Sequence, residues 1–199
     1  MDLTAEATRI GEVIEASTGE FTAQCYQLNQ APPLGSLVKV SSLPLEIYAV
    51  VYDIQNHSLD MGRRPIARGE NEETEEGLFH ANPQLSKLLC TDFNALVLGH
   101  RQASDIAHWL PSKPAYIHNF VYVCSSDEVR DFTQSLHFLS LLIAANLRSP
   151  VDEVIAACLR YSSQAHQEPH AFLVKAGKEL AILLSGDLRR LNSILRKLQ

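Results

Sequence analysis

Three arginines in a short polar segment are the residues of this chain best suited to bind a partner. Arg63, Arg64 and Arg68 belong to the tract Arg-Arg-Pro-Ile-Ala-Arg, and a run rich in glutamate follows between positions 70 and 76. A guanidinium group donates paired hydrogen bonds that match a carboxylate or a phosphate. Two interpretations follow: the arginines pair with the glutamates in a solvated loop, or they dock onto an acidic partner surface or a phosphate.

The eight histidines form no recognisable metal-binding motif. His166 and His170 have the spacing that places two imidazoles on one helix face, but Pro169 disfavours a regular helix through them. His100, His108 and His118 have no cysteine or carboxylate at ligand spacing, so we expect surface or structural roles for them. The sequence therefore predicts no metal site and no cofactor.

The sequence motifs of common enzymes are absent. Without a G-x-x-x-x-G-K-[ST] tract there is no phosphate-cradling loop, so we expect neither hydrolysis nor tight binding of ATP or GTP. No G-x-S-x-G tract marks a nucleophile, and glutamates in a charged run are usually solvated rather than catalytic. The pattern predicts that the protein is not an enzyme.

The cysteines are too far apart in sequence for a zinc ribbon or a redox pair. We expect them to be buried thiols in a reducing compartment. They are Cys25, Cys90, Cys124 and Cys158.

The composition is that of an ordinary globular protein, with 46% hydrophobic and 20% charged residues among 199. The formal net charge of −6 disfavours a general binder of the nucleic-acid backbone. The longest apolar stretch, 136–147, is too short and too interrupted by polar residues to span a bilayer. No signal peptide is recognisable at the start, so we expect a cytoplasmic protein.

Alternating apolar residues predict strands at six places in the first part of the chain. Phe21, Ala23 and Cys25 share one face at period two, and 47–54 is apolar enough for a central strand covered on both faces. The predicted strands span 10–17, 21–28, 37–40, 47–54, 93–100 and 120–124.

The charged residues 56–80 predict an insertion that forms a mobile arm or a binding loop, with a short helix near 72–79. After it, Asn82 and Pro83 predict the cap and first turn of another helix.

From residue 125 the apolar period becomes helical. Ser125 and Glu128 predict a capping box, and the apolar stripe from Val129 to Ile143 predicts one continuous helix. Ser149 and Asp152 predict the same capped start for a second helix. Two further helices are expected over 172–184 and over 188–198. The last helix carries four cations, whose position near a helix C-terminus is explained by the helix dipole. DNA contact is the alternative. These cations are Arg189, Arg190, Arg196 and Lys197. The predicted fold class is α+β, a small six-stranded β-barrel over residues 7–125 followed by a C-terminal helical bundle over 126–199.

Three tracts of the first part, G-E-V-I-E-A-S-T-G-E-F-T, P-P-L-G-S-L-V-K-V and I-Y-A-V-V-Y-D-I, resemble the HAS-barrel family. This barrel stands at the N-terminus of HerA-type DNA translocases and of rotary ATP synthase subunits. The later tract N-P-Q-L-S-K-L-L-C-T-D-F-N-A-L-V-L-G-H resembles its closing half. In those families an ATPase core usually follows the barrel, whereas here helices follow. The resemblance implies a barrel that holds subunits in a ring and docks accessory proteins, and performs no chemistry.

These observations predict a non-enzymatic interaction or assembly module that docks on a larger complex such as a ring ATPase. Arg63, Arg64 and Arg68 are the expected contacts to a protein partner. The alternative is an accessory factor in nucleic-acid processing that contacts DNA through basic loops. A hydrolase whose site is assembled from distant residues is a third hypothesis.

Overall fold

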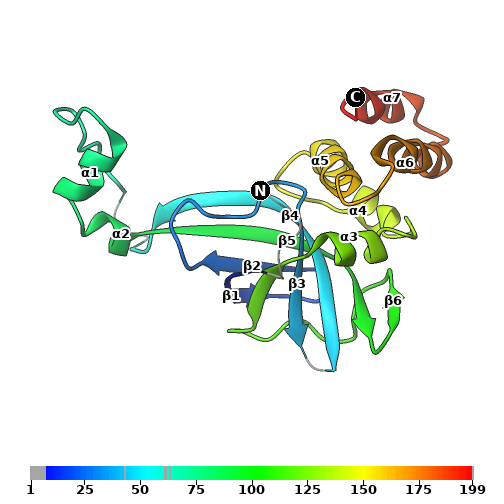
Figure 1. Ribbon diagram of the computed structural model, residues 1–199, viewed down its shortest axis with the longest axis horizontal. Coiled ribbons are helices and arrows are strands. Elements are labelled where there is room, and N and C mark those ends of the chain that lie inside the picture. Colours follow the sequence, from blue (N-terminus) through cyan, green and yellow to red (C-terminus); the bar gives the residue numbers. More distant parts are fainter. Residues whose placement is uncertain (1–7, 43, 61, 63, 199) are drawn as a thin grey trace.

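A closed barrel of antiparallel strands forms the first part of the computed structural model, which describes residues 8–42, 44–60, 62 and 64–198 (Figure 1). The strands pair in the order β2-β1-β7-β3-β4-β5, and pairing between β2 and β5 closes the barrel. They are β1 (Arg9–Ala16), β2 (Glu20–Cys25), β3 (Leu37–Ser42), β4 (Leu45–Ser58), β5 (Leu89–Gln102) and β7 (Phe120–Val123). The predicted six-stranded barrel is confirmed. A short seventh strand, β6 (Asp105–Ala107), pairs with the end of β5, and three residues are too few to show a period.

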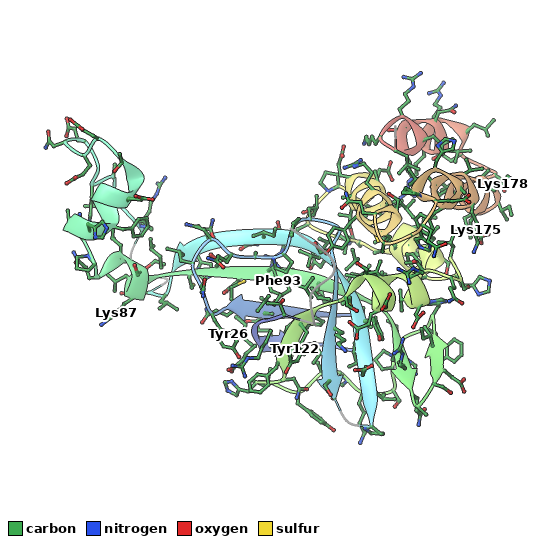
Figure 2. The ribbon with its side chains drawn as sticks, in the orientation of Figure 1. Tyr26, Lys87, Phe93, Tyr122, Lys175 and Lys178 are labelled. Carbon is green, nitrogen blue, oxygen red and sulfur yellow. The ribbon has the colours of Figure 1, made fainter. Side chains whose placement is uncertain are left out.

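The first half of β4 has two buried faces, as its apolar run predicts. Ile47, Ala49 and Val51 fill the barrel interior together with Phe93 of β5 (Figure 2). Tyr48 and Val50 point the other way, into the core beneath the C-terminal helices. Because both faces are covered, period-two alternation disappears from this strand.

In the described part of the chain, five helices follow the barrel and share a core with its outer face. They are α3 (Ser126–Phe132), α4 (Leu139–Ala144), α5 (Val151–Ser163), α6 (Pro169–Leu183) and α7 (Leu188–Arg196). The predicted capping box begins α3: Ser125 Oγ accepts from the Glu128 amide at 3.4 Å, and the Glu128 carboxylate accepts from the Ser125 amide at 2.9 Å. The mixed α+β class is confirmed.

Two helix predictions were wrong. The stripe from Val129 to Ile143 belongs to two helices, because the chain turns at 133–138 and the Thr133 hydroxyl donates to the Val129 carbonyl at 2.6 Å. Ser149 does not cap α5, which begins after Pro150 without a side-chain cap. The Ser149 hydroxyl instead lies 3.5 Å from Asp53 Oδ1 of β4, because α5 starts next to the barrel wall.

All four cysteines are free and buried, as the sequence predicts. Burial raises the pKa of Cys25 to about 11 and that of Cys158 to about 12. Burial also raises the pKa of Cys124. These groups are therefore protonated at neutral pH and act as packing residues.

Two histidines are packed into the helical part. His108 Nε2 donates to the Phe132 carbonyl at 2.9 Å, and His166 stacks on Phe172 with ring centroids 4.2 Å apart. Burial lowers the pKa of both imidazoles. His166 lies before α6 and His170 lies inside it, so the two do not share a helix face.

The partly buried imidazoles predict a loss of stability in acid. Their pKa is lower in the folded state than in the unfolded chain, so the unfolded chain takes up more protons as the pH falls below about 6.5. We expect His108→Gln, which keeps a donor for the Phe132 carbonyl, to reduce the fall in unfolding free energy between about pH 7 and pH 5. Urea denaturation at each pH measures this change, and an unchanged slope in the variant would contradict a neutral, partly buried His108.

Candidate interaction arm and its histidine cluster

Strands β4 and β5 continue beyond the barrel as a two-stranded ribbon. They pair with each other from Leu45 to Ser58, but β3 accompanies β4 only as far as Val50, and β2 accompanies β5 only from Asp92 onward. The ribbon carries α1 (Glu75–Ala81) and α2 (Leu85–Leu88) away from the barrel. We call residues 53–91 the arm, and the connection over 59–88 between its two strands the tip. Figures 1 and 2 place the tip, with Lys87, at the opposite end of the molecule from α6 and α7.

The insertion predicted over 56–80 has different limits in the structure. Residues 56–58 still belong to β4, and the connection runs on to residue 88. The helix expected near 72–79 is α1, capped by the Thr74 hydroxyl, which accepts from the Gly77 amide at 3.0 Å. Asn82 does not begin a helix but ends α1, since its side-chain amide donates to the Leu78 carbonyl at 3.1 Å.

The tip of the arm exposes both charged and aliphatic groups. Arg64 and Arg68 are exposed, and no described carboxylate forms an ion pair with either one; Arg63 lies outside the described residues. Ile66 is 72% exposed, and Leu59 is 53% exposed. Arginines beside exposed aliphatic side chains are typical of protein contact surfaces.

At the base of the arm, three polar side chains from β4 and β5 meet. The strand register sets His57 opposite Cys90, and Asp92 follows on the same face of β5. His57 Nε2 lies 2.8 Å from Asp92 Oδ2 and 3.6 Å from Cys90 Sγ. Cys90 and Asp92 are buried, and His57 is partly exposed. Their ligand atoms all lie within 4.8 Å of one another, so this cluster could hold a metal ion.

Neighbouring groups orient the cluster. His57 Nδ1 lies 3.0 Å from the Ser58 carbonyl, and the Gln24 amide donates to Asp92 Oδ1 at 3.0 Å. The Ser58 carbonyl, followed by Asp92, raises the pKa of His57. Burial, followed by Asp92, raises the pKa of Cys90, which argues against a nucleophilic thiolate.

Sequence reasoning missed this cluster because no local spacing reveals it. Cys90 and Asp92 lie between a predicted helix and the predicted start of a strand at residue 93. Only the pairing of β4 with β5 brings them to His57. One sequence signal could have revealed the cluster. If the strand predicted from residue 93 is extended back to residue 89, Cys90 and Asp92 alternate with their neighbours and fall on the same face.

Two of the four cations in and after α7 form ion pairs with carboxylates of α5. Arg190 Nε lies 2.7 Å from Asp152 Oδ1, and Lys197 Nζ lies 2.6 Å from Glu153 Oε1. Both pairs hold α7 against the first turn of α5. This arrangement gives these two residues a packing role in addition to dipole complementarity.

No protein-family model matches this chain, and no curated protein is significantly similar to it in sequence. Within the described residues, none of the helices is long and apolar enough to cross a membrane.

Proposed function

We propose that the protein is a non-enzymatic interaction or assembly module that docks on a larger complex such as a ring ATPase. The observation that carries this proposal is the arm, a pair of strands that leaves a closed barrel and holds two short helices away from it (Figure 1). The arm would supply the docking surface and the barrel its rigid support.

The lack of buried residues along the arm supports the existence of a binding partner. None of the described residues from 59 to 89 is buried. Ordering the backbone costs roughly 1–2 kcal/mol per residue, and little apolar burial within the tip offsets that cost. A partner that covers Ile66 and Leu59 would supply the missing burial.

Membership of the HAS-barrel family is part of the same proposal. The barrel strands extend from Arg9 to Val123, close to the span of 7–125 that the sequence resemblance covers. In that family the barrel holds subunits together and docks accessory proteins. In this chain α3–α7 stand where an ATPase core usually follows.

The charge balance favours a protein partner over DNA. The net charge is −6, and the arginines of the tip stand next to a glutamate-rich run. Phosphate-backbone binding needs a basic surface. The buried, free thiols support a cytoplasmic location.

The arginines of the tip give the test. We expect the triple variant Arg63→Ala, Arg64→Ala and Arg68→Ala to keep its melting temperature, because Arg64 and Arg68 are exposed and exposed ion pairs contribute only about 0–1 kcal/mol to stability. Its capture of partners from cell lysate should fall about tenfold or more, since arginine anchors are among the strongest contacts in protein interfaces. Calorimetry and affinity capture with mass spectrometry measure the two effects.

A matched control removes exposed arginines elsewhere. Arg189→Ala with Arg196→Ala takes two cations from the surface of α7 and should leave the captured partners unchanged. The proposal is wrong if the triple variant unfolds, or if it retains every partner at the level of the native chain.

A further inference from the structure

We propose that His57, Cys90 and Asp92 bind a divalent transition-metal ion of the zinc type at the base of the arm. An imidazole nitrogen, a thiolate sulfur and a carboxylate oxygen are the donor types that zinc uses in proteins. All three donors come from paired strands rather than from loops. The β4–β5 ladder therefore brings them together before any ion arrives.

The distances are close to those that a tetrahedral ion requires. Bonds of about 2.0–2.3 Å at tetrahedral angles place nitrogen, oxygen and sulfur donors roughly 3.3–3.6 Å apart. Cys90 Sγ is 3.6 Å from both His57 Nε2 and His57 Nδ1, and Nε2 is 2.8 Å from Asp92 Oδ2. All the ligand atoms lie within 4.8 Å of one another. On binding, the nitrogen and oxygen would separate by about half an ångström, and the Cys90 side chain would rotate so that its sulfur faces Nε2.

The surrounding hydrogen bonds orient the ligand atoms. The Ser58 carbonyl can only accept, so His57 Nδ1 carries the hydrogen of their 3.0 Å contact. Nε2 shares a second hydrogen with Asp92 Oδ2 across 2.8 Å, and the ion would replace that hydrogen, which leaves as a proton. The Gln24 amide holds Asp92 Oδ1 at 3.0 Å and leaves Oδ2 to face the imidazole. Contacts of this kind orient histidine and carboxylate ligands around protein-bound metals.

Solvent can reach the His57 side of the cluster. A cavity of about 490 Å³ lies beside His57, and Asn56, Ser58 and Asp60 form part of its wall. Water from this cavity would complete the fourth position. The ion would join β4 to β5 and, through Gln24, to β2, where the arm leaves the barrel.

Metal titration of the full-length chain tests the proposal. We expect one Zn²⁺ per chain by calorimetry, and Co²⁺ should give the thiolate charge-transfer band and the intense visible bands of a tetrahedral site. His57→Gln, Cys90→Ser and Asp92→Asn should each weaken binding by at least about tenfold, and Gln24→Ala by about 10–100-fold without touching the ion. Cys90→Ser should also lose the charge-transfer band.

The chain offers a matched control in a second histidine–carboxylate pair. His118 Nδ1 lies 3.0 Å from Glu12 Oε2, and no cysteine joins them in a ligand cluster among the described residues. His118→Gln should therefore leave metal binding unchanged. Circular dichroism of each metal-free variant checks its folding, and histidine ¹⁵N NMR of the native chain avoids variants altogether, because Zn²⁺ should shift His57 Nε2.

Three results would overturn the metal site. These are no uptake of Zn²⁺ or Co²⁺ by the native chain at millimolar metal, retention of the charge-transfer band in Cys90→Ser, or a Zn²⁺ shift confined to histidines other than His57. None of them bears on partner capture by the arm, so the two proposals fail separately.

Discussion

Replacing Phe132 with alanine is expected to lower the free energy of unfolding by about 3–5 kcal/mol. Phe132 ends α3 and is fully buried. Its ring stacks on Tyr48 of β4 at 4.9 Å and meets the edge of His108 at 4.7 Å. Truncation would leave a cavity between the barrel wall and the helices, where close packing prevents full collapse.

The matched control for Phe132→Ala is an exposed phenylalanine. Phe120 of β7 is 42% exposed, and the Arg9 guanidinium lies 4.7 Å from its ring centroid. Phe120→Ala should cost only about 1 kcal/mol or less, the size of an exposed cation–π contact. Urea denaturation compares the two variants, and equal losses would show that Phe132 does not join α3 to the barrel.

Replacing Gly35 with alanine is expected to destabilise the fold by about 2–5 kcal/mol. Gly35 has φ of 84°, in the left-handed region, where an L-residue costs about 1–2 kcal/mol. An added Cβ would also stand 2.4 Å from the backbone carbonyl carbon of Ala157 in α5. Neither the helix backbone nor the loop can move away freely, because the Gly35 amide donates to the Val51 carbonyl at 2.8 Å.

Gly19 provides the comparison for Gly35. It lies in the turn between β1 and β2, and a Cβ there would meet no atom within 4 Å. Gly19→Ala should change the unfolding free energy by less than about 0.5 kcal/mol. Thermal melting of both variants measures the difference; a Gly35→Ala protein as stable as Gly19→Ala would contradict the close approach of the loop to α5.

The barrel could be predicted from sequence because its strands carry strong local patterns. Phe21, Ala23 and Cys25 alternate with polar residues, and all three are buried as expected. Residues 47–52 are apolar on both faces because one face fills the barrel and the other meets the helices. Here hydrophobic periodicity and tertiary packing require the same residues.

The arm and its cluster could not be predicted in the same way. Residues 56–58 and 89–92 are mixed in polarity, so nothing in their pattern marks the outer ends of β4 and β5. The sequence did single out the charged segment that forms the tip, and Arg64 and Arg68 are exposed there. The meeting of His57 with Cys90 depends on strand register, which pattern analysis of one strand does not contain.

The strand order also has a consequence for how the chain folds. β7 is the last strand in sequence, yet it lies between β1 and β3 in the barrel. Until residues 120–123 are synthesised, the strands can form only an open sheet in the order β1-β2-β5-β4-β3, whose two edges are unpaired. Barrel closure therefore joins segments more than a hundred residues apart and comes late in folding. During synthesis the nascent chain exposes two strand edges that can pair with other chains until β7 inserts between them.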